Sequence, residues 1–291
     1  MTKTTQPEIE ARKDIDFGLD GNIPRYWHSN DPFKTRIHDA LQSTFPEGER
    51  YFISSVRAFR DQIKDEKLIH EVKEFTVQEA QHGIAHTKYN NLLAEQGMPM
   101  ERLLAEHKNK TKEDERRWSP EYNLAITAAA EHFTALLADT YFTNKETTAG
   151  MNSKMRALFA WHAIEEMEHR SVAFNVMKDV AKVGYFTRAT AMIHATWIIS
   201  HFMFHFADQM LEADGFSKWQ RRKMFIKNLP WLYGPRKGLL SSFTPNLLRY
   251  FKPSFHPEDI PVVHNYGEWV KSYDATGNPH QACDALLAAA Y

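Results

Sequence analysis

The chain has 291 residues, of which 36 are Lys or Arg and 37 are Asp or Glu, so its net charge is close to zero. This balance gives no support for a basic nucleic-acid-binding surface, and we expect no nucleic-acid partner. Hydrophobic residues make up 43% of the chain, which suits a globular protein with a substantial core. Cys283 is the only cysteine, so an internal disulfide is excluded and a reducing compartment is favoured.

The N-terminal residues 1–30 are polar and irregular in pattern, and we expect them to form an arm without regular structure. They contain no apolar stretch of the kind found in secretory signals, which predicts a cytoplasmic protein. Residues 31–291 are expected to form a single helical domain. Within it, the sequence predicts a bundle at about 47–182 and a C-terminal helical extension at about 186–291.

Helical periodicity dominates the chain after the arm, and the alternation typical of strands is scarce, so we predict an all-α fold. Proline and glycine residues, beginning with Pro46, mark the expected ends of the helices. The predicted helices cover residues 33–45, 47–64, 67–96, 99–117, 120–146, 152–182, 186–213 and 217–229, with shorter ones near 237–250, 265–273 and 279–290.

The longest uncharged run covers residues 189–207, and its length would permit a membrane span. Three histidines, His194, His201 and His205, dilute its apolar character. We therefore expect a buried helix here, and contact with lipid is the alternative. Its aromatic side chains are candidates for the wall of a hydrophobic pocket or for ordinary core; they are Trp197, Phe202, Phe204 and Phe206.

Two helix pairs repeat one arrangement of acidic residues and histidines. In the first pair, residues 47–96, Glu49 precedes the sequence EAQH by about one helix hairpin. That sequence holds Glu79 and His82 at positions i and i+3, which lie on one face of a helix. The first pair can therefore offer two carboxylates and one imidazole to a common point.

The second pair, residues 120–182, carries the same arrangement. Glu131 precedes the sequence EMEH, in which Glu166 and His169 are again three residues apart. Glu131 is the single formal charge within residues 122–138, where small apolar side chains surround it. A buried carboxylate there needs a partner, which a metal ion or a buried salt bridge would supply.

Two lone Glu residues and two Glu-x-x-His units on four helices make up the ligand set of di-iron and di-manganese bundle proteins. Carboxylates and imidazoles suit iron or manganese, and the lack of thiolates argues against structural zinc or an iron–sulfur cluster. We therefore predict two metal ions, iron or alternatively manganese. By the bundle pattern, Glu79 and Glu166 would bridge the ions, and Glu49 and Glu131 would be terminal. A coincidental set of buried ion pairs is the alternative.

His162 precedes Glu166 by four residues and shares its helix face, which favours a seventh ligand over a core histidine. His86 stands in the same relation to His82. We leave His86 out of the ligand set, because eight symmetric ligands would leave no open position for substrate.

Glu165 points away from the face of Glu166, and its role stays open between two alternatives. One is a hydrogen bond to His82 that fixes the tautomer of the imidazole. The other is an ion pair with an arginine such as Arg50 or Arg57. Glu168 is expected at the surface or in an ion pair.

These residues resemble a known family, the ferritin-like proteins described as predicted metal-dependent hydrolases. The resemblance covers roughly residues 20–250 and implies a ferritin-like four-helix bundle with a dinuclear metal site and additional C-terminal helices. It rests on RYWHSNDPFKTRIHDALQSTFPEGERYFISSVR (25–57), FTVQEAQHGIAH (75–86), AAEHFTALL (129–137) and WHAIEEMEHRSVAFNV (161–176).

The ligand order is also similar to that of di-iron oxygenases and ribonucleotide reductase small subunits. Those proteins usually carry Asp before the second Glu-x-x-His, where this chain has Glu165. The position of His162 is similar to that of the extra histidine in di-iron arylamine N-oxygenases.

Two enzymatic functions follow from these patterns. The favoured one is O2-dependent oxidation of a small apolar substrate at a di-iron centre, which would need an electron donor. The alternative is hydrolysis of an ester or related bond by a metal-activated water, for which Glu165 or His86 could serve as a base. Iron storage fits poorly, because about 110 residues follow the fourth bundle helix. These extra residues suggest a pocket wall or the surface of a homodimer.

Overall fold

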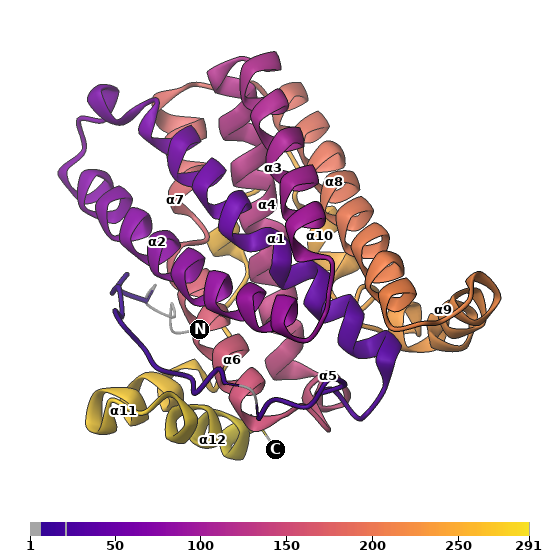
Figure 1. Ribbon diagram of the computed structural model, residues 1–291. Coiled ribbons are helices and arrows are strands. Elements are labelled where there is room, and N and C mark those ends of the chain that lie inside the picture. Colours follow the sequence, from indigo (N-terminus) through magenta and orange to yellow (C-terminus); the bar gives the residue numbers. More distant parts are fainter. Residues whose placement is uncertain (1–6, 21, 291) are drawn as a thin grey trace.

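Four helices surround the centre of the molecule (Figure 1). They are α1 (Pro32–Arg57), α2 (Glu66–Glu95), α4 (Pro120–Thr143) and α6 (Ser153–His169). The structure, a computed structural model, describes residues 7–20 and 22–290. In this part of the chain there are helices and no strand, which confirms the prediction of an all-α fold. An isolated bridge joins His28 to Met151.

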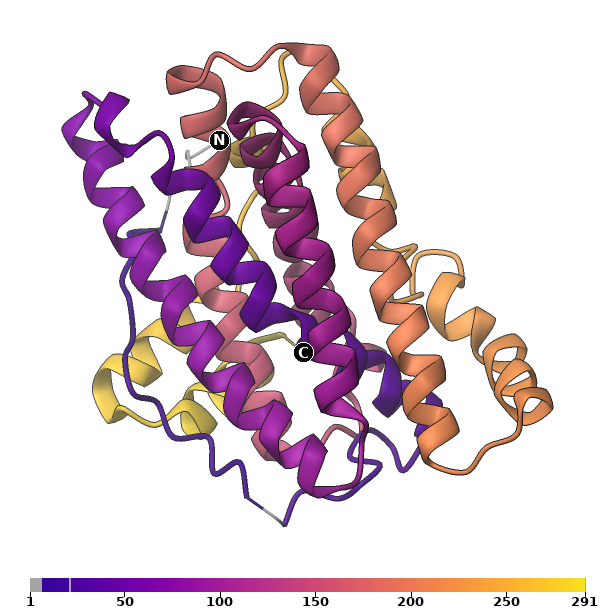
Figure 2. The ribbon, with the colours of Figure 1, turned by 45° about the horizontal axis from the view of Figure 1, so that its top comes forward.

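The remaining helices cover the outside of these four (Figures 1 and 2). Helix α8 packs against both α1 and α4, and α12 packs against α6. Their bounds are α3 (Met100–Arg117), α5 (Lys145–Thr148), α7 (Val172–Asn175), α8 (Tyr185–Ala213), α9 (Lys218–Tyr233), α10 (Thr244–Arg249), α11 (Tyr266–Thr276) and α12 (Pro279–Ala290), with short turns η1 (Arg60–Gln62), η2 (Val176–Val180) and η3 (Pro257–Asp259).

Short polar side chains fix the start of the main helices. Each accepts a hydrogen bond from a backbone N–H in the first turn, which would otherwise lack a partner. These capping residues are Asp31 before α1, Asp65 before α2, Ser119 before α4, Asn152 before α6 and Ser217 before α9.

Helix α1 continues through Pro46, so the predicted break at this residue is wrong. A proline inside a helix removes a hydrogen bond and usually ends the helix. Here other donors serve the carbonyls of the preceding turn. The Thr44 hydroxyl donates to the Leu41 carbonyl, and the Asn90 amide of α2 donates to the Ser43 carbonyl. Helix α1 also packs against both α2 and α8 along its length, which supports its continuous course through Pro46.

The predicted helix 152–182 is also wrong as a single element. Helix α6 ends at His169, and α7 and the π-helical turn η2 follow after a short turn. A π-turn fits one extra residue into the helix and changes its course. Helix α6 packs against α4, and so do α7 and η2, so the chain remains packed on α4 after the bend.

The predicted helix 237–250 is shortened to α10, and turns occupy residues 237–243. Gly238 explains the difference, because a Cβ atom there would lie 2.6 Å from the Gly234 nitrogen and 2.7 Å from the Leu232 oxygen. The chain folds back closely on the end of α9 at this point, which a regular helix would prevent.

The arm preceding α1 contains turns and extended segments but no helix over its described residues, 7–20 and 22–31. It runs along the outside of α2 and α6 (Figure 2). Its apolar side chains Phe17, Ile23 and Trp27 are buried, and the Phe17 ring packs on Trp161 of α6 at 5.2 Å. The arm is therefore part of the core despite its irregular backbone.

Helix α8 contains the uncharged run at residues 189–207. Within the described residues, no helix combines the length and the apolarity needed to cross a lipid bilayer. One face of α8 is buried against α1 and α4, but the other exposes Ile193 and Trp197, so the predicted buried helix is buried on one side only.

Candidate metal centre

The seven predicted ligands lie together at the centre of the four inner helices. Each of these residues is at most 6% exposed, although Glu and His are rarely buried unless they are paired or bind a metal. We call these seven residues the Glu/His cluster: Glu49 from α1, Glu79 and His82 from α2, Glu131 from α4, and His162, Glu166 and His169 from α6.

Ligand atoms within the cluster are close enough to share metal ions. Four overlapping groups of three residues each place one atom per residue within 4.8 Å of the others. Glu49, Glu79, His82, His162 and Glu166 each belong to two of these groups, so neighbouring groups share ligands. The groups are Glu49–Glu79–His82, Glu79–Glu166–His169, His82–His162–Glu166 and Glu49–His86–His162.

Two histidines of the cluster use one ring nitrogen to contact a buried side chain on another helix. His82 Nε2 lies 3.0 Å from Glu165 Oε2, and His169 Nδ1 lies 2.9 Å from Gln78 Oε1. If each of these nitrogens donates to the oxygen, the second nitrogen of the ring keeps its lone pair. That second nitrogen faces the carboxylates of the cluster, as in a typical histidine ligand.

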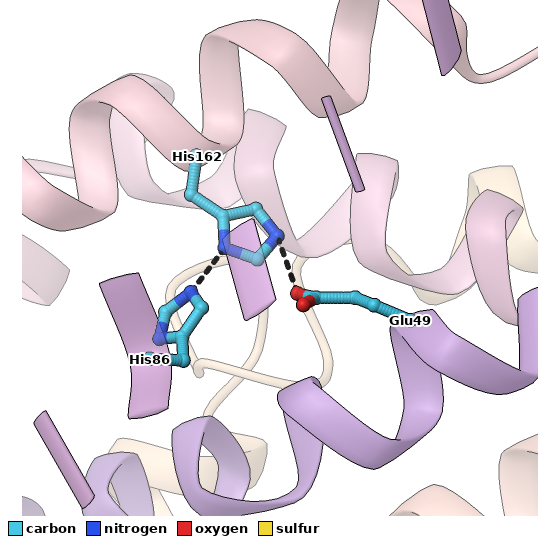
Figure 3. A group of neighbouring side chains, drawn as sticks. All are labelled: Glu49, His86 and His162. Atoms are coloured by element: carbon cyan, nitrogen blue, oxygen red, sulfur yellow. Dashed lines mark hydrogen bonds and ion pairs between the residues drawn. The ribbon is translucent and has the colours of Figure 1, made fainter. Parts of the chain in front are cut away.

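His162 has the same arrangement with His86 as its partner (Figure 3). His162 Nδ1 lies 2.6 Å from His86 Nε2, which orients the ring. Its other nitrogen, Nε2, lies 2.9 Å from Glu166 Oε1 and 4.0 Å from Glu49 Oε1. His86 therefore supports His162 from outside the Glu/His cluster.

Several polar atoms of the cluster are buried without a hydrogen-bond partner. They include both carboxylate oxygens of Glu49, Glu79 and Glu131, and the ring nitrogens His82 Nδ1 and His169 Nε2. His169 Nε2 lies 3.0 Å from Glu79 Oε1 and 3.1 Å from Glu131 Oε2, but these contacts lack hydrogen-bond geometry. Such atoms are costly to bury, so the donor set fits positively charged ions between the helices.

The electrostatics of the cluster support the same conclusion. Burial raises the pKa of Glu131 to about 7 and raises the pKa values of Glu49 and Glu79 well above 4.5, to which neighbouring carboxylates add. Burial also opposes the charged form of Glu166, but the hydrogen bond from His162 and the nearby charge of His169 outweigh it and hold its pKa well below 4.5. Without ions, these four carboxylates cannot all be charged at low cost.

Glu165 makes both contacts that the sequence left open, but with a different arginine. It contacts His82, and its other oxygen accepts from the backbone N–H of Arg12 at 3.1 Å and from the guanidinium at 3.3 Å. Arg12 also binds Glu168, which is buried rather than at the surface. Burial raises the pKa of Glu165 to about 7, and the charge of Arg12 opposes this rise.

A cavity of about 110 Å³ adjoins one side of the cluster. Glu49, His162 and Glu166 face it, whereas neither Glu165 nor His86 lines it. The rest of its wall is mainly apolar and comes from α1, α3, α4 and α8. The apolar lining includes Leu41, Phe45, Phe52, Ile126, Ile198 and Phe202.

The aromatic side chains of α8 have different environments. Phe202 lines the cavity beside the cluster, and Phe206 belongs to the core. Phe204 faces a separate hollow beneath α9, and Trp197 is 58% exposed. The predicted pocket wall is therefore formed by one of the four aromatic residues, together with aliphatic neighbours.

Sequence reasoning missed three side chains, of which two touch the cluster and the third, Arg12, binds Glu165 beside it. Gln78 and Thr134 are uncharged residues within helices, and Thr134 donates to Glu166 Oε2. Arg12 lies in the irregular arm, where no periodicity predicts a position. A signal did exist for His86, because it mirrors the spacing of His162.

Comparison with known proteins adds a family. The family model described as "Predicted metal-dependent hydrolase" matches residues 11–260. Searches of curated proteins and of solved structures give no match. The matched region contains all four inner helices and every residue of the Glu/His cluster. This all-helical chain with a buried Glu/His cluster belongs to the predicted metal-dependent hydrolase family.

Proposed function

We propose that the Glu/His cluster binds two divalent metal ions and that the chain hydrolyses an ester or related bond of an apolar substrate. The main support for this proposal is the set of buried carboxylate oxygens and imidazole nitrogens that have no hydrogen-bond partner. Four carboxylates balance the charge of two divalent ions. The description of the family supports hydrolysis, which places this function ahead of the oxidation that the ligand pattern favours.

In this proposal, all seven residues of the cluster are ligands, and α1, α2, α4 and α6 form a ferritin-like bundle. Glu79 and Glu166 would be shared by the two ions, as the repeated order of ligand types in the sequence suggests. Glu49 and Glu131 would be terminal ligands. When bound, the ions would supply Lewis acidity and a water of lowered pKa.

The chain itself would position the substrate. Glu49, His162 and Glu166 form the polar end of the cavity, and Phe45 and Phe202 belong to its apolar wall. An apolar group held by this wall would place its polar bond beside the cluster. Neither Glu165 nor His86 faces the cavity, so we assign both to holding histidines rather than to proton transfer with substrate.

Oxidation at a di-iron centre is the second candidate, and the ligand order favours it. Three imidazoles within a Glu-rich set match the pattern that the sequence shares with di-iron oxygenases. An apolar cavity suits an oxidisable substrate as well as an apolar ester. This function would additionally require O2 and an electron donor.

One experiment tests the proposal and separates the two functions. The metal content of the purified protein is measured, and a panel of apolar esters is assayed anaerobically with zinc or manganese in place of iron. We expect about two ions per chain and hydrolysis without O2. Turnover that requires iron, O2 and a reductant would overturn hydrolysis in favour of oxidation. Protein that takes up no metal would overturn both.

Glu165→Leu is expected to lower metal affinity between about 10- and 100-fold, because the orienting contact to His82 is lost. Glu165→Gln keeps an oxygen that can accept from His82 and should retain more of the affinity. Titration with a competing chelator measures both variants. Equal affinity in the Leu variant and the parent protein would contradict a role for Glu165 in positioning His82.

Ala195→Phe is expected to fill the cavity while leaving the ions bound. Ala195 is buried on α8, lines the cavity and is not one of the proposed ligands. We expect kcat/KM to fall at least about tenfold with unchanged metal content. Ile193→Phe is the matched control, since Ile193 lies on the same helix but is 63% exposed. Full activity of Ala195→Phe would show that substrate does not occupy this cavity.

A further inference from the structure

The near-zero net charge of the chain conceals one strongly basic segment. Between Asp214 and Glu258 there are nine Lys or Arg residues and no acidic residue. Helix α9 carries five of these cations, which are Lys218, Arg221, Arg222, Lys223 and Lys227. Arg221 pairs with Asp208 and Glu212, and the described part of the chain shows no ion pair for the other four. This helix therefore presents an unbalanced positive charge to its surroundings.

The same helix exposes large apolar side chains. Trp219, Ile226 and Tyr233 are spaced by seven residues, so they form a row along one face. Their exposed fractions are 62%, 64% and 46%, and Leu229 beside them is 38% exposed. Burying such surface is favourable, and an exposed row of this kind marks an interaction site more often than an isolated side chain does.

The position of α9 makes this row accessible. Both views show α9 projecting from the outer side of α8, away from the four inner helices (Figures 1 and 2). Its inner side is held by Leu232, which is buried, and by Phe225, which contacts Phe33 and Phe204. At 100° per residue, these fastening contacts lie about 100° to 120° around the helix from the Trp219 row, so the row itself stays largely exposed.

Cations flank the apolar row on both sides. At 100° per residue, Arg222 lies on one side of the row, and Lys223 and Lys227 lie on the other. The Lys223 ammonium lies 4.1 Å from the centre of the Trp219 ring. A row of Trp, Ile and Tyr with basic residues along both edges is the pattern of a helix that lies in a membrane interface.

We propose that α9 docks in the plane of an anionic phospholipid surface, with the Trp219 row in the headgroup region and its cations on the lipid phosphates. A second copy of the chain would place like charges against each other at this face. Nucleic acid would attract the cations but would leave Ile226 and Leu229 without an apolar partner. An anionic lipid surface matches both the charge and the apolar row.

Flotation of the full chain with vesicles tests the proposal. We expect it to bind vesicles that contain phosphatidylglycerol, to bind pure phosphatidylcholine weakly, and to be released at high salt. Trp219→Ser combined with Ile226→Ser should lower the partition coefficient at least about tenfold, and so should Arg222→Glu combined with Lys223→Glu.

Matched controls come from α2, on another part of the surface. Ile69 and Ile84 are exposed apolar residues, and Lys73 and Lys88 are exposed cations. The double variants Ile69→Ser/Ile84→Ser and Lys73→Glu/Lys88→Glu should bind vesicles like the parent chain, and thermal melting verifies the fold of all variants. Several outcomes would overturn the proposal: no binding to anionic vesicles, equal binding by α9 and control variants, or an α9 variant that instead loses self-association or binding to RNA.

Discussion

His169→Ala is expected to contain at least one metal ion per chain fewer than the parent protein. His169 Nε2 lies within 3.1 Å of Glu79 and Glu131 and has no hydrogen bond of its own. Its removal leaves a position with carboxylates but without the nitrogen donor, and Glu131→Ala should have the same effect from the opposite helix. Elemental analysis of the purified variants measures the loss.

A buried histidine outside the cluster provides the control for this prediction. His132 follows Glu131 on α4, but its ring packs on Tyr250 and Phe255. His132→Ala should lose stability through the cavity it leaves, while keeping its metal. If His169→Ala and Glu131→Ala both retain full metal content, the assignment of the site is wrong.

Metal is expected to stabilise the fold more at about pH 8 than at about pH 5. In the metal-free chain, burial raises the pKa of Glu131 from 4.5 to about 7 and those of Glu49 and Glu79 well above 4.5. The folded chain then holds protons that the unfolded chain releases above pH 4.5. Its stability therefore falls as the pH rises from 4.5 through about 7, and the loss persists at higher pH.

Metal ions replace these protons, so they bind more tightly as the pH rises. At a hundredfold excess over Kd, binding adds about 3 kcal/mol to the free energy of unfolding. A domain of this size gains about 2 to 4 °C in Tm per kcal/mol, which gives roughly 6 to 12 °C at about pH 8 and little at about pH 5. Thermal melts with and without metal at both pH values measure the difference. A metal-induced shift that is independent of pH would contradict the predicted coupling between metal and protons.

The sequence predicted the helices and the composition of the cluster because both depend on local spacing. Positions three or four residues apart share a helix face whatever the rest of the chain does, so Glu79 and His82 meet as predicted. The prediction that both helix pairs contribute to one cluster came from the repeated order of Glu followed by Glu-x-x-His in each pair. His86 was set aside by an argument about open positions, and the structure gives it a place as the partner of His162.

Tertiary packing decided the features that the sequence did not reveal. Pro46 signals a helix end, yet Asn90 from another helix serves a carbonyl beside it and α1 continues. No glycine or proline marks the break in the helix after His169. After this break, α7 and η2 pack on α4. Arg12 reaches Glu165 and Glu168 across more than 150 positions of the chain, and no local pattern predicts such a contact.

The cavity meets the cluster from one side, and this asymmetry has a consequence for the exchange of ions with solvent. Glu49, His162 and Glu166 face the cavity, whereas His169 and Glu131 are enclosed by the helices. Under the proposed assignment, an ion held near His162 would leave through the cavity, and an ion held near His169 would leave only when helices separate. The two sites would therefore exchange at very different rates, so one chain could hold a labile ion beside a long-lived one.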